Sequence, residues 1–438
     1  MKPINVGLLG IGTVGGGVWT VLLRNEEEIQ RRAGRAIRIT TVADKDLERA
    51  RRVTAGKARL TVDAFEVVRD PDIDIVVELI GGTTVAKALI LAAIAAGKHV
   101  VTANKALLAT HGNEIFAAAQ GKDVMVAFEA AVAGGIPIIK ALREGLTANR
   151  IEWIAGIING TSNFILSEMR DKGLAFGEVL REAQARGYAE ADPTFDIEGI
   201  DAAHKLTILS AIAFGIPMQF DKAYTEGISG LTREDIRYAE QLGYRIKLVG
   251  ITKKTAEGIE LRVHPTLIPA RRLIANVEGV MNAVLVHGDA VGSTLYYGAG
   301  AGAFPTASSV VADLVDVTRL HTADPEHRVP HLAFQPDRLV ATRILPMEEV
   351  TTSYYLRMQV LDRPGVLADI TRIFADLSIS IEAVVQREPA EGEDQVDLIL
   401  LTHQTREKHI NAAIERIEAL PVVSGKITRI RIEELGKN

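Results

Sequence analysis

The sequence predicts an α/β protein of three parts: a doubly wound parallel sheet, a middle α+β domain and a small ferredoxin-like domain at the C-terminus. Strand-like apolar runs alternate with helical segments over residues 1–130, which is typical of a parallel sheet. A long apolar helix followed by strands occupies residues 131–302. Residues 351–438 show the order βαββαβ of a ferredoxin-like unit. Proline-containing segments at residues 326–350 predict a linker before that unit.

Composition limits the class of protein. The chain has 438 residues and is 47% hydrophobic, which is enough apolar material for several cores. It carries 50 basic and 56 acidic residues without a long run of either sign, so we expect neither nucleic acid nor a membrane surface as partner. It has no cysteine, which excludes disulfides, thiolate nucleophiles and zinc–cysteine sites. The N-terminus enters a strand-like run without a signal-type leader, and no stretch is apolar enough to span a membrane, so we expect a cytoplasmic protein.

A glycine-rich turn follows the first predicted strand, Ile4 to Leu9. It reads Gly10-Ile11-Gly12-Thr13-Val14-Gly15, and helical spacing of apolar residues begins directly after it. In this order the first glycine permits a tight turn, the second lets the backbone approach a pyrophosphate, and the third lets the helix pack on the strand. The helix N-terminus adds N–H groups for the phosphates. This predicts a Rossmann-type domain that binds NAD(P).

The residues after the second predicted strand, Ile37 to Ala43, bear on cofactor preference. Asp44 ends that strand, where such domains place the acid that bonds the ribose 2′-hydroxyl of NAD. Lys45 and Arg49 follow and can hold the 2′-phosphate of NADP instead, or lie on a solvated face. Because the acid repels that phosphate, the balance favours NAD.

Later strands of this domain end in polar or glycine residues. Doubly wound sheets bind ligand at these carboxyl ends, where Gly81 follows one predicted strand and Lys105 follows the next. The predicted elements are strands at Ile73 to Leu79, His99 to Thr102 and Val124 to Phe128, and a helix at Ala86 to Ala96.

A stretch of carboxylates, Ala183 to Lys205, leads into a very apolar helix. Asp192-Pro193 predicts a turn, and the helix is predicted from Ile200 onward. Asp201 and Lys205 stand four residues apart and so share one face of it. An exposed pair of this kind is the alternative, but so apolar a helix leaves little solvated surface, and we expect the pair to be buried. A buried lysine beside carboxylates is a candidate acid or base.

Two turns and a histidine group flank this stretch. A strand at Ile151 to Ile158 leads to a turn and a helix start that Thr161 or Ser162 is expected to cap. Gly298 to Ala307 is a second glycine-rich turn before an apolar helix, and it lacks the lysine of a P-loop. Later strands are predicted near Ile246 to Ile251 and Ile259 to His264. His321, His327 and His331 are expected to be solvated loop histidines rather than metal ligands.

The stretch from Ala183 resembles the signature of homoserine dehydrogenases. The family also carries an Asn-Lys pair like residues 104–105 and a turn like NGTSNFIL at residues 159–166, so the resemblance covers essentially the whole chain. It implies reversible NAD(P)-dependent reduction of L-aspartate 4-semialdehyde to L-homoserine, in threonine, methionine and isoleucine biosynthesis. The matching signature places are Ala183, Gly187, Tyr188, Ala189, Asp192, Pro193, Asp196, Gly199, Asp201 and Lys205.

The resemblance also implies roles for single residues. Lys205 becomes the proton donor to the substrate oxygen, and Asp201 with Glu190 holds the amino-acid substrate. Lys105 becomes a second cation near nicotinamide and substrate, although a surface lysine that caps a loop is its alternative. Gly302 is placed near the cofactor, where residues 303–325 return to complete the nucleotide domain.

In the family, the loop that matches residues 129–137 can hold a monovalent cation such as Na⁺. The ligands by position are the Glu129 side chain and the carbonyls of Val132, Gly134 and Ile136, and oxygen ligation suits a hard cation. A tight hinge explains the glycines of this loop equally well.

The tail resembles the ACT domain, a regulatory unit that binds amino acids at interfaces between copies. The Asp362-Arg363-Pro364-Gly365 turn matches, whereas Leu377-Ser378-Ile379 departs from the glycine or asparagine often found after the first helix. Threonine is the expected effector, and we expect the tail to be a separable module. Family members associate through the middle domain, which implies a homodimer or homotetramer.

Two other functions stay open from the sequence alone. One is an oxidoreductase for a different amino-acid aldehyde, and the other is an amino-acid sensor that keeps the nucleotide fold without catalysis. The intact set of Glu190, Asp201, Lys205 and Lys105 argues against the sensor.

Overall fold

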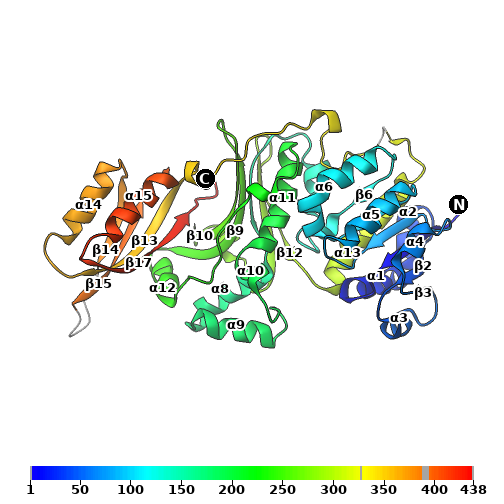
Figure 1. Ribbon diagram of the computed structural model, residues 1–438, viewed down its shortest axis with the longest axis horizontal. Helices are drawn as coiled ribbons and strands as arrows, with labels where there is room; N and C mark the ends of the chain where they lie inside the picture. Colours follow the sequence, from blue (N-terminus) through cyan, green and yellow to red (C-terminus); the bar gives the residue numbers. More distant parts are fainter. Residues whose placement is uncertain (1, 326–327, 387–393, 437–438) are drawn as a thin grey trace.

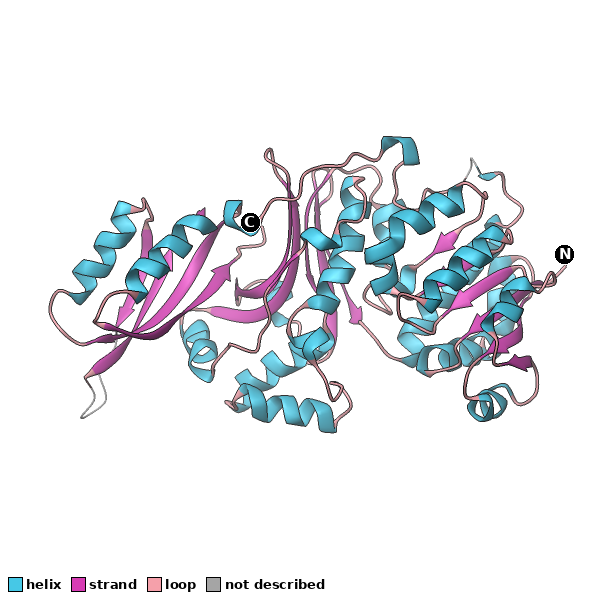
Figure 2. Ribbon diagram, in the orientation of Figure 1, coloured by secondary structure: helices cyan, strands magenta, loops and turns pink. Residues whose placement is uncertain are grey.

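Two sheets organise the chain in the computed structural model, which describes residues 2–325, 328–386 and 394–436 (Figures 1 and 2). One is a six-stranded parallel sheet in the order β3-β2-β1-β4-β5-β6. The other has eleven strands, with the path β12-β11-β7-β9-β10-β17-β13-β15-β14 and with β8 and β16 attached beside it. The predicted fold class is therefore confirmed: a Rossmann-type domain, a mixed-sheet α+β domain and a ferredoxin-like tail.

The parallel sheet holds the glycine turn between its first strand and first helix. It is built from β1 Ile4–Leu9, α1 Thr13–Arg24, α2 Glu26–Ala33, β2 Ile37–Ala43, α3 Leu47–Thr54, β3 Arg59–Thr61, α4 Ala64–Arg69, β4 Ile75–Glu78, α5 Val85–Ala95, β5 His99–Thr102, α6 Lys105–Gln120 and β6 Val126–Ala127. The return segment α13, Ala303–Leu320, packs on α1. Gly17 allows this approach, because a Cβ there would lie 2.4 Å from the Ala303 carbonyl oxygen.

The middle of the chain places helices against one face of the mixed sheet (Figure 1). Its sheet residues Ile154, Leu248 and Val263 share one core with Leu206 and Leu209 of α11. Its elements are α7 Ile138–Lys140, β7 Ile151–Ile157, α8 Gly160–Lys172, α9 Phe176–Ala185, α10 Thr194–Ile197, α11 Ile200–Phe214, β8 Tyr224–Thr225, α12 Arg233–Gln241, β9 Tyr244–Lys254, β10 Ile259–Pro269, β11 Met281–Gly288 and β12 Gly292–Ala299.

The tail has the predicted order of strands and helices, and it shares a sheet and a core with the middle domain. Its β17 pairs in parallel with β10, Thr266 opposite Arg431 and Leu267 opposite Ile432. One face of its sheet packs on α14 and α15 as a core of its own, and the other contributes to the core of the middle domain. The elements are β13 Thr351–Leu361, α14 Val366–Asp376, β14 Ile381–Gln386, β15 Gln395–Thr402, β16 Thr405–Arg406, α15 Glu407–Glu418 and β17 Val423–Ile432.

The expectation of solvated histidines before the tail is wrong for two of the three residues. The His331 ring accepts a hydrogen bond from Val126 N at 3.1 Å and stacks on Phe116, and the His321 ring packs edge-on against His99. His327 lies outside the described residues, as does residue 326 at the start of the predicted linker. Within the described ranges, no group of three His, Asp or Glu side chains is arranged to hold a metal. None of the helices described is long and apolar enough to cross a membrane.

Candidate active site

The predicted Asp201–Lys205 pair is buried, as its apolar helix required. Helix α11 follows Gly199, whose left-handed backbone (φ 79°) suits glycine, and every residue from Asp201 to Phe214 is buried. The Lys205 ammonium donates to Asp201 Oδ2 at 2.7 Å and to the carbonyl oxygen of Ile158 at 2.7 Å. Two fixed acceptors therefore hold Lys205 at the base of α11.

A second lysine reaches the same carboxylate from the nucleotide domain. Lys105 Nζ lies 3.0 Å from Asp201 Oδ1, and Lys105 is the first residue of α6, directly after β5. Asn104 caps that helix through Leu107 N and donates to the carbonyl oxygen of Gly82 at 2.7 Å. One carboxylate thus bridges two lysines across the boundary between the domains, and the Lys105 side chain keeps 37% of its surface exposed.

The two lysines differ in their electrostatics. Burial lowers the pKa of Lys205, an effect that Asp201 opposes and the neighbouring Lys105 charge reinforces. Asp201 raises the pKa of Lys105, against the effect of burial. Burial acts to raise the pKa of Asp201 itself, but both lysine charges hold it below its usual range. The cluster therefore places a carboxylate with a lowered pKa between a lysine with a raised pKa and a lysine with a lowered pKa.

Asn159 joins a further carboxylate to this cluster. The sequence had not indicated a role for Asn159 in the site. Its side-chain nitrogen donates to Asp201 Oδ2 at 2.9 Å and to Asp196 Oδ1 at 2.7 Å. Burial and the nearby Asp201 charge raise the pKa of Asp196. The asparagine before the NGTSN glycine was the available signal, because Asn is a preferred residue at a helix N-cap.

Helix α8 is capped by a residue other than Thr161 or Ser162, so the prediction of its cap is wrong. Asn159 Oδ1 accepts from Ser162 N at 2.8 Å and caps the helix. The Thr161 and Ser162 hydroxyls donate instead to the carbonyl oxygens of Tyr188 and Asp196, at 2.6 and 2.9 Å. They fasten the signature stretch to α8.

Glu190 lies apart from the buried cluster, exposed on the loop between α9 and α10. Within the described part of the chain its carboxylate accepts no hydrogen bond. Its negative charge nevertheless contributes to the raised pKa of Lys105.

The glycine turn has the geometry that close backbone approach requires. Gly10 has φ 92°, and a Cβ on Gly15 would lie 2.1 Å from the Gly10 carbonyl oxygen. A Cβ on Gly12 would meet nothing within 4 Å, which leaves open space at the N-terminus of α1. A phosphate can approach that helix end, and Thr13 and Val14 supply its first turn.

Asp44 is held at the edge of this turn. Its Oδ2 accepts from Ile11 N at 2.7 Å, and its Oδ1 lies 3.0 Å from the Arg49 guanidinium. Burial acts to raise the pKa of Asp44, but these contacts outweigh it and keep that pKa below its usual value. Acid and cation therefore lie together where a ribose 2′ substituent is expected.

Glu78 was missed by the sequence reasoning and organises the next loop. It is fully buried at the end of β4, where its Oε1 accepts from Ile80 N and Gly81 N at 2.9 and 3.0 Å. Its Oε2 accepts from the Thr102 hydroxyl at 2.7 Å. Glu78 thus fixes Gly81 next to the strand that leads to Lys105. An acid inside an apolar strand pattern was the only signal in the sequence.

The loop from Glu129 is tightly packed. The buried Glu129 carboxylate accepts from Ile139 N and Lys140 N at 2.9 and 2.8 Å, and burial raises its pKa. Ala133 and Gly134 both have positive φ, 53° and 43°, which turns successive carbonyls. The Gly134 carbonyl oxygen accepts from the Ser309 hydroxyl at 2.6 Å, which joins this loop to α13 beyond Gly302.

Three family models match the chain. A homoserine dehydrogenase NAD-binding domain matches residues 10–129, a homoserine dehydrogenase domain matches residues 137–315, and an ACT domain matches residues 354–422. Together they follow the order of the three parts seen in the structure.

Known proteins resemble the chain over its whole length. Homoserine dehydrogenase from Pseudomonas aeruginosa is 64% identical over 99% of this chain and 100% of its own. A crystal structure of a homoserine dehydrogenase from Thiobacillus denitrificans is 74% identical, with a TM-score of 0.96 over 100% of this chain and 99% of that one. A hyperthermophilic archaeal homoserine dehydrogenase in complex with NADPH is 26% identical, with a TM-score of 0.62, and covers 72% of this chain and 98% of that one.

Proposed function

The chain belongs to the homoserine dehydrogenase family, and we propose that its Lys205–Asp201–Lys105 cluster carries out the reduction of L-aspartate 4-semialdehyde to L-homoserine. The observation that carries this proposal is the single buried carboxylate that bridges two lysines of unlike pKa. The family is NAD(P)-dependent, and bound NAD(P)H supplies the hydride that reaches the aldehyde carbon.

Lys205 is the proposed acid. As negative charge develops on the substrate oxygen, a lysine with a lowered pKa gives up its proton readily, and Asp201 and the Ile158 carbonyl keep it in position. Lys105 keeps its charge and stabilises the same oxygen. Asp201 and Glu190 are the proposed partners of the substrate ammonium and hydroxyl groups, through charge-assisted hydrogen bonds.

The reaction itself is tested by oxidation of L-homoserine with NAD⁺ and NADP⁺, followed by NAD(P)H absorbance. We expect homoserine to be oxidised faster than every other hydroxy amino acid. Faster turnover of a different amino-acid alcohol would favour the alternative oxidoreductase, and no turnover of any would favour the sensor.

Asp201→Asn should move the pH dependence of aldehyde reduction to lower pH. Reduction needs protonated Lys205, so the rate falls as pH rises through the pKa of that lysine. Asp201 raises this pKa, so its loss lowers the pKa and brings the fall to lower pH. The measurement is kcat against pH, with the exposed Asp221→Asn as control. An unmoved profile in Asp201→Asn would show that the two groups do not couple.

NAD is the proposed preferred cofactor, because the acid Asp44 stands where the 2′-hydroxyl binds, although Arg49 beside it can pair with a 2′-phosphate. Arg49→Ala should raise KM for NADPH by about tenfold, as expected for a lost charge-assisted bond, and change KM for NADH less. Arg51→Ala, on the same helix but paired with Glu48, is the matched control. Equal changes for both cofactors would remove Arg49 from 2′ recognition.

A monovalent cation such as Na⁺ is the proposed partner of the Glu129 loop. Support comes from a buried carboxylate whose raised pKa a bound cation would lower, and from the turned carbonyls near Gly134. Val132, Gly134 and Ile136 would complete the oxygen ligands. Na⁺ should raise the Tm of the wild type relative to choline at equal ionic strength, and Glu129→Gln should lose the difference. Glu144→Gln is the control, and equal responses of the wild type and Glu129→Gln would contradict the site.

The chain is proposed to associate through its mixed sheet into a homodimer or homotetramer. Several large apolar side chains are exposed on its strands and adjoining loops, as a covered face would require. They are Leu273, Val280, Val291 and Tyr297. A cytoplasmic location and a threonine effector of the ACT domain also remain proposals.

A further inference from the structure

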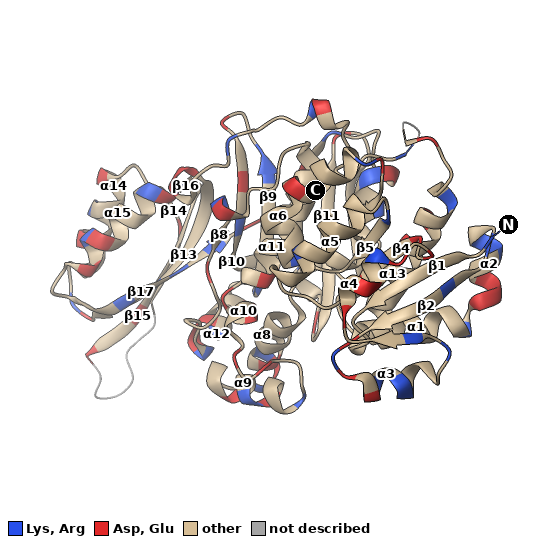
Figure 3. Cartoon of the chain, turned by 45° about the vertical axis from the view of Figure 1, so that its right-hand side comes forward, with Lys and Arg blue, Asp and Glu red and all other residues tan. Residues whose placement is uncertain are grey.

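A cleft of about 510 Å³ lies on the nucleotide domain, beside the half of α1 that is remote from the glycine turn. Its walls come from α1, from β2 and from the loop that leads from α3 into β3. In Figure 3 the nucleotide domain is turned forward, and blue marks the basic positions on β2 and α3. The cleft is therefore distinct from the places where the cofactor and the catalytic cluster are expected.

The cleft exists because α3 and β3 are short. Helix α3 ends at Thr54, and Ala55 and Gly56 take a left-handed backbone (φ 48° and 73°), which turns the chain back toward the sheet. Strand β3 then pairs only with the last three residues of β2. In the described part of the chain, residues 37–39 thus have β1 on one side and no strand on the other. This stretch of strand edge is open to a ligand.

The cleft has an apolar floor and a cationic rim. Trp19 and Leu22 of α1 and Ile39 of β2 are largely buried side chains that line it. Arg38 and Lys57 are exposed at the rim. Among the residues that the structure describes, neither cation makes an ion pair or a side-chain hydrogen bond. An apolar surface beside two free cations is complementary to an anion with an apolar body.

The other charges at the rim do not cancel these cations. Arg59 also lines the cleft and pairs at 3.1 Å with Asp70, which does not line it. Glu26 is the one acid among the described lining residues, so the rim carries more positive than negative charge. A carboxylate is therefore attracted and an ammonium group repelled. A nucleotide is less suited, because its ribose hydroxyls would lie on apolar side chains that offer no hydrogen bonds.

We propose that this cleft binds a small aliphatic or aromatic carboxylate, with the apolar body on Trp19 and the carboxylate group at Arg38 and Lys57. A cleft of this volume is within the range that small-molecule sites occupy. The site is separate from the cofactor turn, because Gly12 and Gly15 lie at the opposite end of α1. It does not depend on the proposed dehydrogenase reaction.

Trp19 gives a direct readout of this site. The chain has two tryptophans, and the other, Trp153, lies on β7 in the middle domain. In Trp153→Phe, ω-bromooctanoate should quench the Trp19 fluorescence saturably, because a bromine atom quenches an indole ring only at short range. The alcohol ω-bromooctanol has the same chain without the charge and should bind at least tenfold more weakly. Trp19→Phe, which keeps Trp153, should show no saturable quenching.

Arg38→Gln combined with Lys57→Gln should weaken the binding of ω-bromooctanoate by at least tenfold. Both side chains are exposed, so the Tm should not change. The matched control is Arg52→Gln combined with Lys122→Gln, which removes the same charge from exposed positions of the same domain outside the cleft. Saturating NAD⁺ should leave the quenching by ω-bromooctanoate unchanged.

Each of three results would overturn the proposal: no saturable quenching of Trp19, equal affinity for the acid and the alcohol, or equal affinity of the charge variant and its control. Loss of quenching on addition of NAD⁺ would place the anion in the cofactor turn instead. If Trp153→Phe is unstable, the wild type gives the same comparison, with Trp153 as a constant background. Turnover without the probe reports separately on the proposed function.

Discussion

Lys205→Ala is expected to lower kcat for aldehyde reduction by on the order of 10² or more, as when a positioned general acid is lost. Lys205 is buried, and the Ile158 carbonyl and Asp201 direct its ammonium group. Lys105 remains to balance Asp201 in the variant, so the fold and NADH binding should persist. Initial rates, NADH affinity and Tm are the measurements.

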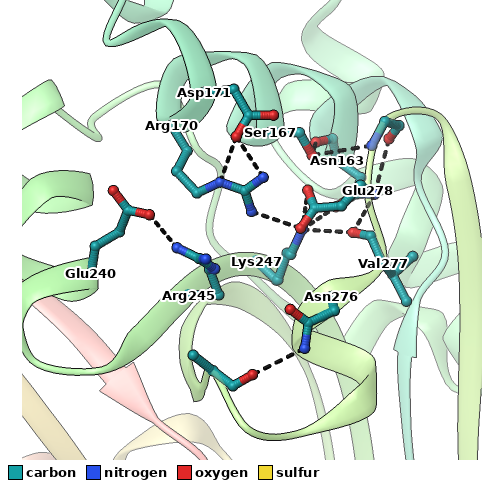
Figure 4. Close-up of polar contacts among 12 residues, drawn as sticks. Asn163, Ser167, Arg170, Asp171, Glu240, Arg245, Lys247, Asn276, Val277 and Glu278 are labelled. Carbon is teal, nitrogen blue, oxygen red and sulfur yellow. Dashed lines mark hydrogen bonds and ion pairs between the residues drawn. The ribbon is translucent and has the colours of Figure 1, made fainter.

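A second buried lysine provides the control. Lys247 donates to the Val277 carbonyl oxygen at 2.6 Å and to Asn163 at 3.2 Å, and pairs with Glu278 (Figure 4). Burial lowers its pKa to about 8. Lys247→Met should therefore lower Tm while kcat stays within a few-fold. Near-normal turnover of Lys205→Ala, or an equal loss in both variants, would remove Lys205 from the chemistry.

Truncation after Met347 is expected to destabilise the catalytic part by on the order of 5 kcal/mol or more. The cut removes β17 from the edge of β10 and strips apolar partners from the shared core, which are Tyr355, Ile399, Leu401, Ile430 and Ile432. It also exposes a strand edge that promotes aggregation. Circular dichroism melts and size-exclusion profiles of the two forms make the comparison.

Point substitutions in the full chain test whether the loss of stability comes from the shared core and not simply from a missing domain. Ile430→Asp on the shared face should lower Tm strongly, whereas Val384→Asp, at an exposed place on β14, should not. A truncated chain that stays monodisperse and melts at the same temperature as the full chain would show that the tail is a separable module. The archaeal relative, which covers 72% of this chain, shows that other family members fold at about the shorter length.

Local patterns predicted most of the elements that form the site. The glycine turn, the apolar strands and the four-residue spacing of Asp201 and Lys205 are short-range features, and the structure has them where the sequence placed them. Lys105 required the family resemblance, because no local signal distinguishes it from a surface lysine. Asn159 and Glu78 were missed, since the partners that define them, Asp201 and Thr102, lie on other elements.

The sequence by itself determined where the nucleotide turn lies and that Asp201 and Lys205 share a buried face, but it did not indicate β3, β11 or β12. Only the tertiary structure decided that Lys105 lies 3.0 Å from Asp201 and that β17 completes a sheet begun by β10. The reason is that pKa values and strand pairing depend on distances between groups remote in the chain. Those distances are set by how domains pack, and no residue pattern within one segment records them.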